Sequence, residues 1–559
     1  MLRKNRWLHV ILVLALTGAF LTVAGCGGGG KEATNAGGRS AETSAAEQPV
    51  PGGTLSVCIA EVSFIDPLFA FESEGLQVVQ ALFEGLTRFD YKTSVVEPCV
   101  AESWDVNADA TVFTFHLKKG TRFHNGREVV AADFKYQWER LSNPVNGSMY
   151  SSLLSMVKGF DAMQDGTDPA TTLSGVKVLD DYTLEVTMAY PFAEFPYVVG
   201  FPDTAPVPKE EVEKDPEAFK SMPVGNGPFK MAEPWKAGHR IKVVKFDGYA
   251  GTKPHIDGID FLIYSDPNTA FLDFKAGTLD WTQIPTGQYK STLAQYGASD
   301  DGVTANPGKQ VQNGQELGVY EVIMNNEDAV FKNADLRRAV SLAINRQAVC
   351  DVAFEGLRKP ATSIIPSGLP GHEANAWQYN HYDPAAAKEM LAKAGYPNGQ
   401  GLPTLRLGFN SGAGHEQAMQ MIQADLKAVG IRSEFEISDA PTYWDKVEKG
   451  TYQIGRSGWQ VDYPTIDNVI YPLFFSTAGQ NFSKYNNPAV DKAILAARQI
   501  PDEAERTKAM QAVVKLIGDD QPEIAICTYA HQRVASDRVH DLVYSPIGYL
   551  NFVDCWISE

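Results

Sequence analysis

The hydrophobic pattern of the chain divides it into an unusual beginning and a long alternating remainder. Residues 8–23 form a mainly apolar run that His9, Thr17, Gly18 and Thr22 interrupt. Residues 27–51 then lack apolar periodicity and are rich in Gly, Ala, Ser and Glu, which is typical of a flexible linker. From Gly53 to Ala60 apolar and polar residues alternate, so this stretch predicts a first strand and the folded part begins near residue 52.

Beyond residue 52 the spacing of apolar residues predicts strands and helices in alternation, which is typical of an α/β protein. The remaining part of the chain, about 510 residues, is too long for one hydrophobic core, so two or three domains are expected. Gly395 is expected to end one short helix, and Asn125-Gly126 indicates a hairpin turn. The clearest strands are expected at 110–117, 256–264 and 319–325, and the clearest helices at 133–140, 269–276, 336–349 and 387–394.

The first 26 residues read as an export signal of the lipoprotein type. Arg3, Lys4 and Arg6 precede the apolar run, and the segment ends in Val-Ala-Gly followed by Cys26. A membrane-spanning helix is the alternative, but such a helix needs roughly 20 apolar residues. We therefore expect cleavage before Cys26, acylation of its thiol and a folded domain tethered outside the cytoplasm.

Composition narrows the classes of partner. The net charge of −19 and the pI of about 5.0 disfavour nucleic acid, and the hydrophobic fraction of 44% is that of an ordinary globular protein. Five cysteines remain after Cys26, so at least one stays free. These cysteines could form one or two disulfides, or they could be buried reduced thiols, and the sequence does not favour any pairing.

Motifs of catalysis and of metal binding are missing from the sequence. The chain has no Gly-x-Ser-x-Gly, no Gly-x-x-x-x-Gly-Lys-Ser/Thr and no His-Glu-x-x-His, so we expect no enzyme, cofactor or metal. Asp105, Asn107 and Asp109 imitate the start of a calcium loop. Ala110 stands where that loop needs glycine and His116 where it needs glutamate, so a turn between strands is expected instead.

Residues 98–141 resemble one protein family closely, and further landmarks follow in the same order to the C-terminus. These landmarks are Ile65-Asp66-Pro67, residues 82–86, residues 225–229, residues 324–326, residues 335–340, residues 382–396 and residues 458–464. On them the chain is identified as a member of the peptide-type (family 5) solute-binding proteins of bacterial ABC importers. The aromatic residues of segment 98–141 are expected in the core, not around a ligand.

The resemblance implies a bilobed α/β fold of the periplasmic-binding-protein kind (class II), in which two lobes close on a ligand like a hinged trap. The first lobe would comprise residues 52–85, 206–317 and 516–559, an extra domain would occupy 86–205, and the second lobe would span 318–515. Gly225 and Gly227 would lie at a crossing point between the lobes.

The resemblance also implies an amino-end site for a peptide ligand. Asp462 would pair with the ligand's α-ammonium group, since a cation taken out of water needs a fixed counter-charge. Tyr150 matches a tyrosine that contacts the first ligand residue. A surface turn for Asp462 and loop packing for Tyr150 are the structural alternatives.

The carboxylate end and the main chain of the ligand have weaker matches. Arg456 and His415 would meet the ligand carboxylate, whereas a salt bridge between lobes and a solvated helix start are their alternatives. Gly458 and Trp459 lie in the same segment as Asp462. The main chain of the ligand would add as a strand beside Gly458 and beside residues 69–73, which include Phe71 and Ser73.

The function that the resemblance implies is the capture of peptides, specifically oligopeptides, by recognition of their main chain and terminal charges. The protein would be a monomer that a lipid on Cys26 anchors to the outer face of the cell membrane. In a host with an outer membrane it would lie in the periplasm. It would deliver its ligand to ABC transporter permease subunits. Haem, a metal chelate or glutathione is the alternative ligand, and a secreted hydrolase is the remote one.

Overall fold

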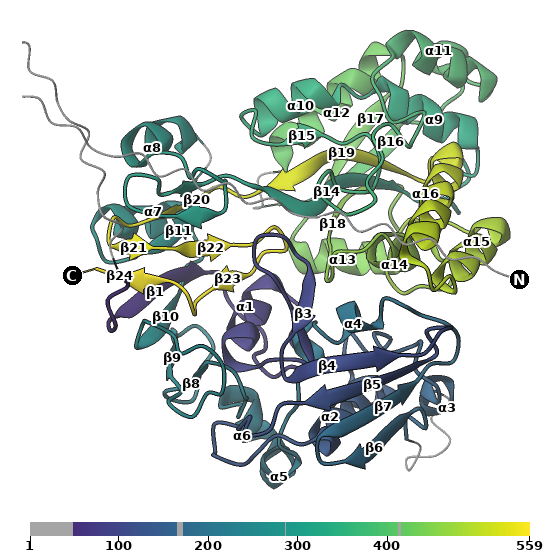
Figure 1. The fold of residues 1–559 in the computed structure, drawn as a ribbon. Helices are drawn as coiled ribbons and strands as arrows, with labels where there is room; N and C mark the ends of the chain where they lie inside the picture. The colour runs from purple at the N-terminus through teal and green to yellow at the C-terminus, as the bar shows by residue number, and fades with distance from the viewer. Residues whose placement is uncertain (1–47, 165–171, 286, 412–414, 559) are drawn as a thin grey trace, which may run out of the picture. The chain divides into compact units, whose positions relative to one another are not determined.

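The computed structural model describes residues 48–164, 172–285, 287–411 and 415–558, and two large mixed sheets organise them (Figure 1). All elements belong to one unit, Pro49–Glu559. The expected signal segment and nearly all of the expected linker lie outside the described residues. In the described part of the chain no helix is long and apolar enough to cross a membrane.

The first sheet has seven strands in the order β13-β20-β11-β1-β10-β9-β8. Its centre is β1, which pairs in parallel with β10 from Thr54 opposite Gly258 to Ile59 opposite Ile263. The strands are β1 Thr54–Ile59, β8 Phe229–Met231, β9 Ile241–Lys245, β10 Gly258–Ile263, β11 Trp281–Gln283, β13 Val311–Gln312 and β20 Arg533–Ala535. The helices of this lobe are α1 Ser73–Leu82, α5 Lys209–Lys214, α6 Pro216–Ser221, α7 Pro267–Lys275 and α8 Tyr289–Tyr296.

The second sheet has six strands in the order β15-β19-β14-β18-β16-β17. β14 is central and antiparallel to both of its neighbours, and nearly all of its residues are buried. The strands are β14 Gln315–Met324, β15 Lys359–Pro360, β16 Leu405–Asn410, β17 Ser433–Ser438, β18 Ile454–Gln460 and β19 Glu523–Ala530. The helices are α9 Ala334–Ala343, α10 Arg346–Ala353, α11 Pro384–Lys393, α12 Glu416–Ala428, α13 Ala440–Glu448, α14 Asp467–Phe474, α15 Pro488–Arg498 and α16 Glu503–Asp520.

Two antiparallel strands connect the sheets. The chain leaves the first sheet at β13 and enters the second at β14, and it returns through β19 to β20. At the crossing the His531 N–H donates to the Gly314 carbonyl (3.1 Å), and the Gly314 N–H donates to His531 Nε2 (2.8 Å). The boundary expected at residue 516 assigns β19 to the first lobe, whereas its pairing with β14 places it in the sheet of the second. We therefore propose that the second lobe extends to about residue 530.

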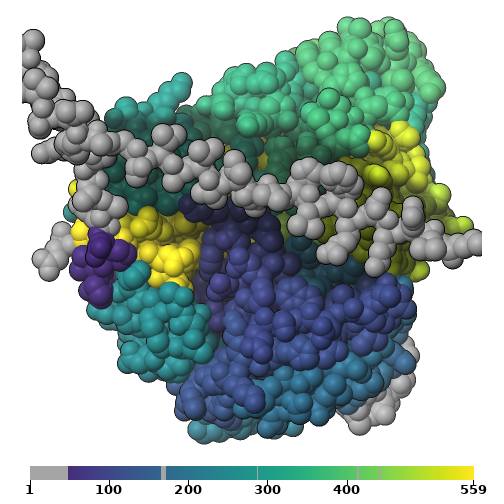
Figure 2. Space-filling view, in the orientation of Figure 1, coloured from purple at the N-terminus to yellow at the C-terminus, as the bar shows by residue number. Residues whose placement is uncertain are grey.

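The segment expected as an extra domain contains a four-stranded antiparallel sheet, β4-β5-β7-β6, visible as the blue strands in Figure 1. In Figure 2 its blue surface lies directly beside the teal surface of the first lobe. The elements are β2 Thr87–Phe89, β3 Val96–Pro98, β4 Ala101–Val106, β5 Val112–Leu117, β6 Val176–Asp180, β7 Thr183–Thr187, α2 Ala131–Ser142, α3 Phe160–Gln164 and α4 Phe195–Val198, with single 3-10 turns η1 Pro144–Asn146 and η2 Pro202–Thr204.

The aromatic residues of this segment form its core, as expected. Phe113, Phe115, Phe123 and Trp138 are at most 1% exposed, and Trp104 is partly buried against them. The indole N–H of Trp138 donates to the Thr204 carbonyl (2.9 Å), which fixes α2 to η2. The pattern of apolar residues therefore predicted this core correctly.

Local chemistry explains where several elements begin and turn. Asp133 accepts from the Val130 N–H (2.9 Å) at the start of α2 and pairs with Arg127 (2.7 Å). The turn expected after Asn107 is confirmed, because the Ala110 N–H donates to the Asn107 carbonyl (3.1 Å). The hairpin turn at Asn125-Gly126 is confirmed as well, with Gly126 at φ +90°.

Two sequence interpretations were wrong. The helix expected over 336–349 is two helices, because Asn345 interrupts the apolar pattern and caps α10 by accepting from the Ala348 N–H (3.1 Å). Gly225 and Gly227 do not cross between lobes. Instead they let the backbone approach the end of α1 closely, and the Gly227 N–H donates to the Leu82 carbonyl (2.8 Å).

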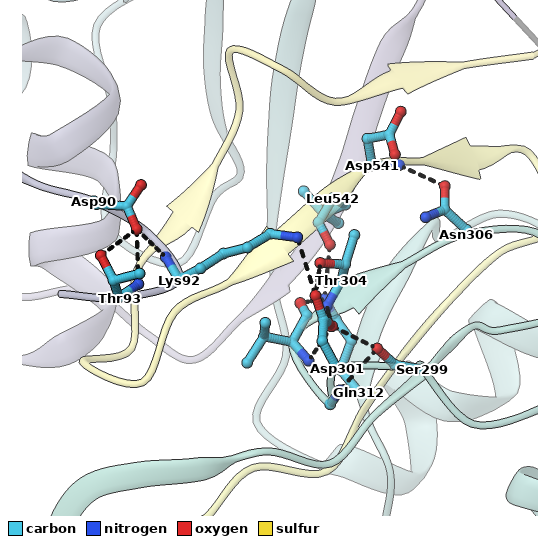
Figure 3. A network of polar contacts seen from close by, with 12 residues as sticks. Asp90, Lys92, Thr93, Ser299, Asp301, Thr304, Asn306, Gln312, Asp541 and Leu542 are labelled. Carbon is cyan, nitrogen blue, oxygen red and sulfur yellow. Dashed lines mark hydrogen bonds and ion pairs between the residues drawn. The ribbon is translucent and has the colours of Figure 1, made fainter. Parts of the chain in front are cut away.

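Short strands and a polar network complete the first lobe. The strands β12 Thr304–Ala305, β22 Leu542–Tyr544 and β23 Leu550–Asn551 form a small sheet, and β21 Val539–His540 pairs with β24 Trp556–Ile557. Lys92, in the turn between β2 and β3, pairs with Asp301 (3.0 Å), as Figure 3 shows. Asp301 also accepts from the Thr304 N–H (2.7 Å), so this network holds the inserted segment to the first lobe.

Candidate functional site

Asp462 and Tyr150 meet in the structure, although 312 residues separate them in the sequence. Asp462 lies two residues after β18, and Tyr150 lies in the loop after η1. The Tyr150 hydroxyl donates to Asp462 Oδ1 (3.1 Å). Asn468, near the start of α14, donates through its amide to Asp462 Oδ2 (3.0 Å) and accepts from the Asp462 N–H (2.8 Å). The carboxylate is therefore held in one orientation from two sides.

Burial controls the charge of this carboxyl. It raises the pKa of Asp462 to about 6, while the hydrogen bonds from Asn468 and Tyr150 oppose the shift. Burial also raises the pKa of the Tyr150 phenol well above its ordinary value, so that Tyr150 remains a neutral donor. Tyr150 packs edge-on against Phe201, with ring centroids 5.0 Å apart. A fixed, partly buried carboxylate beside a neutral donor is suited to an ammonium group.

Gly458 and Trp459 lie in β18, four and three residues before Asp462. A Cβ on Gly458 would lie 1.9 Å from the Tyr529 hydroxyl and 3.0 Å from the Val319 carbonyl, so no larger residue fits there without a shift. The Trp459 indole N–H is buried and has no acceptor among the described residues. Such a donor is free to bind an acceptor from a ligand.

Arg456 lies in β18 as well, over the ring of Tyr320 (5.1 Å). Its Nη2 donates to the Tyr529 hydroxyl (3.4 Å), and its buried Nε has no partner among the described residues. Arg456 forms no ion pair with any of the described residues. Within that part of the chain, the alternative of a salt bridge between lobes therefore does not hold.

His415 lies beside Arg456 but carries no charge. Its Nδ1 is 3.4 Å from the Tyr320 hydroxyl, and its side chain is 7% exposed, so it is not the solvated helix-start residue of the alternative. Burial, followed by the charges of Arg456 and Arg358, lowers the pKa of His415 to about 3. His415 can therefore donate to a ligand carboxylate only as a neutral imidazole.

Arg358 is a cation that sequence reasoning missed. It lies between α10 and β15, with its guanidinium over the rings of Phe354 (4.0 Å) and Tyr529 (4.8 Å). Its buried Nη1 has no partner among the described residues. A single arginine in Gly-Leu-Arg-Lys-Pro forms no motif, so the sequence does not mark it. The fold brings it to Tyr529, which Arg456 also contacts.

Phe71 and Ser73 lie on the first lobe, at the start of α1. The chain is extended at Glu72, whereas Ser73 is already the first helical residue, so any added ligand strand would run only as far as Glu72. Phe71 is 43% exposed, and its ring lies near that of Phe64 (6.5 Å between centroids). In the described part of the chain no acceptor binds the Phe71 N–H.

The remaining expectations concern lipid, thiols and metals. Cys26 lies outside the described residues. Cys58, Cys99, Cys350, Cys527 and Cys555 are all free thiols, and only Cys58 is not buried. Across the described ranges no group of three or more His, Cys, Asp or Glu side chains is arranged to hold a metal ion.

Comparisons with known proteins agree with this arrangement. Residues 95–481 match the family model described as "Bacterial extracellular solute-binding proteins, family 5 Middle". The chain is 28% identical to the oligopeptide-binding protein OppA of Bacillus subtilis, over 99% of this chain and all of that protein. It is 26% identical to the heme-binding protein A of Haemophilus influenzae, over 96% of this chain and 97% of that one.

A solved structure shows the same fold. The structure of Haemophilus influenzae OppA in complex with RPPGFSPFR superposes with a TM-score of 0.74 and 26% identity, and it covers 90% of this chain and 99% of that one. The chain therefore belongs to family 5 of the bacterial extracellular solute-binding proteins, the peptide-type binding proteins of ABC importers, and it has their bilobed α/β fold.

Proposed function

We propose that this protein captures peptides outside the cytoplasm and delivers them to the permease subunits of an ABC importer. The observation that carries the proposal is the carboxylate of Asp462, which Tyr150 and Asn468 orient without neutralising it. An α-ammonium group supplies the missing positive charge. The relatives named as oligopeptide-binding proteins support the same ligand class.

The other features of the site fit the rest of a peptide. The Phe71 N–H and the backbone beside Gly458 would bind the ligand main chain, which makes binding indifferent to most side chains. Arg456, Arg358 and neutral His415 would meet the ligand carboxylate or an acidic side chain. The lobes would close over the bound peptide, so that binding selects one conformation and involves no chemistry.

Isothermal titration calorimetry with the tripeptide Ala-Ala-Ala tests the assignment of Asp462. Asp462→Asn should weaken binding by at least about tenfold, because a charge-assisted hydrogen bond is lost while the fold is kept. Asp247→Asn, at an exposed aspartate between β9 and β10, is the matched control and should bind as the wild type does. Equal affinity of the wild type and Asp462→Asn would contradict the assignment.

Native mass spectrometry of the purified protein tests the ligand class. We expect a series of masses that correspond to bound peptides. Haem absorbance, or a retained metal chelate or glutathione, would instead contradict peptide capture; one relative of this chain is named a heme-binding protein.

We also propose that Cys26 carries the lipid that anchors the protein to the outer face of the membrane. The small residues before Cys26 and the linker after it support this assignment. The full-length protein should partition into the detergent phase of Triton X-114, and Cys26→Ser should partition into the aqueous phase. Detergent partitioning of both proteins would contradict lipidation at this residue.

A further inference from the structure

The end of the site that holds Asp462 contains more negative charge than one ammonium group can balance. Asp203, in η2, is fully buried, and neither of its carboxyl oxygens has a donor among the described residues. Glu72 Oε2 is likewise buried without a donor. A buried carboxylate without a partner is costly, so such a group must either hold a proton or wait for a cation.

The surroundings of Asp203 connect it to the site. Phe201, two residues before it, packs against Tyr150. Asp203 and Asp462 act on the same two phenols, raising the pKa of Tyr150 and of Tyr549 after the larger effect of burial. Burial and then the charge of Asp462 raise the pKa of Asp203 well above its ordinary value. Burial and the nearby acidic groups therefore favour the neutral form of Asp203 in the empty site.

No cation of the surrounding elements is available to Asp203. The charged groups that act on it are all acidic, and they are Asp462, Asp66 and Glu72. Arg140, the cation bound to Asp66, is already engaged by both oxygens of that carboxylate (2.6 and 2.8 Å). A positive charge that pairs with ionised Asp203 would therefore have to come from outside the described part of the chain.

The backbone that carries Asp203 is rigid. Gln137, in α2, donates to the Asp203 carbonyl (3.0 Å), and Trp138 donates to the Thr204 carbonyl (2.9 Å). Both donors are fully buried. Asp203 therefore cannot turn toward solvent to recover hydration, which makes its position a fixed feature of the site.

A cavity borders the segment that carries Asp203, although neither Asp203 nor Asp462 is among its lining residues. Pro202, next to Asp203, and Tyr549 are among the residues that line a cavity of about 360 Å³. Acidic side chains outnumber basic ones on its walls: the acids are Glu84, Asp90, Glu97, Asp541 and Asp554, and the bases are Arg88 and Lys92. The cavity thus favours a cationic group over an anionic or apolar one.

From this geometry we propose that Asp203 is a further ligand-binding residue, which receives a second cationic group near the ligand's α-ammonium. The inference rests on the proposed function, since Asp462 is taken to hold the α-ammonium itself. The ligand class is a peptide whose first residue carries a side-chain amine. The bound amine and Asp203 form a charge-assisted pair, and the proton of the neutral acid leaves to solvent as the pair forms.

Calorimetry with matched peptides tests the proposal. The probes are tripeptides X-Ala-Ala in which X is ornithyl or lysyl, and the neutral comparison has norleucine. We expect at least one diamino peptide to bind wild type about tenfold more tightly than the norleucyl peptide. In Asp203→Asn this preference should disappear, so that the diamino peptides and the norleucyl peptide bind with equal affinity.

A measurement on the wild type alone keeps the test independent of folding. Titrations at pH 7 in phosphate and in Tris, which differ in ionisation enthalpy, give the protons released on binding. The preferred diamino peptide should release about one proton more than the norleucyl peptide. Equal release, or a preference that Asp203→Asn retains, overturns the inference. If no peptide binds the wild type at all, the proposed function fails instead.

Discussion

Lowering the pH should weaken peptide binding, because Asp462 must be ionised to pair with the ammonium group of the ligand. Burial raises the pKa of Asp462 to about 6. At pH 7 about nine-tenths of the molecules then carry the Asp462 carboxylate, and at pH 5 about one-tenth do. The α-ammonium group of a peptide, with a pKa of roughly 8, is charged throughout this range. The affinity for Ala-Ala-Ala should therefore fall about tenfold between pH 7 and pH 5.

The direction of this change follows from the two states. An ammonium group favours the charged form of Asp462, so the pKa of that carboxyl is lower in the complex than in the empty protein. The affinity that Asp462 contributes is thus present above about pH 6 and is lost as the pH falls through that value. His415 does not oppose the loss, because its pKa of about 3 keeps it neutral at pH 5.

The assay is calorimetry with Ala-Ala-Ala at pH 7, 6 and 5 at constant ionic strength. Asp462→Asn is the control, since an amide does not titrate, and its weak binding should not change over this range. Asp203→Asn separates the two acids and should keep the tenfold decrease. Wild-type affinity that stays constant from pH 7 to pH 5, or an equal decrease in Asp462→Asn, would refute the reasoning.

Three further predictions concern stability and access. Arg506→Met leaves Glu194 buried without its ion-pair partner, which lies at 3.1 Å. The free energy of unfolding, measured in urea, should therefore fall by about 3 kcal/mol. A value within error of the wild type would contradict a role for this pair. Gly227→Ala places a Cβ 2.6 Å from backbone and should lower the melting temperature, whereas Gly479→Ala, which meets nothing within 4 Å, should not; equal melting temperatures would be inconsistent with the close approach. Iodoacetamide should label Cys58 in the native protein before any of the four buried thiols, as peptide mapping can check, and uniform labelling would speak against their burial.

The sequence allowed the elements and the family to be predicted where local signals were strong. Strand β1 and helix α11 were predicted within a few residues, because alternation marks the strand and Gly395 marks the end of the helix. The α9–α10 break was missed, since Asn345 lies inside an otherwise regular apolar pattern. The pairing of β19 with β14, about 200 residues away, could not be predicted from local signals, and it is the reason for the revised lobe boundary that we propose.

The candidate site was predictable only where a motif exists. The resemblance carried by residues 458–464 pointed to Asp462, and its meeting with Tyr150 agrees with that resemblance. Arg358 and Asp203 were missed, because each is a single charged residue in an ordinary turn. What makes them notable is the absence of a partner among the described residues, and that is a property of the folded surroundings alone.

The paired connection between the sheets has a mechanical consequence. Strands β14 and β19 are hydrogen-bonded to each other as they leave the first sheet, and their register shifts between Gln315 and Val319, next to the crossing. A two-stranded ribbon resists stretching and shear but can twist or bend where its register is irregular. Any turning of one lobe against the other would therefore bend or twist this ribbon near residues 315–319, while its paired strands keep the lobes from sliding past each other.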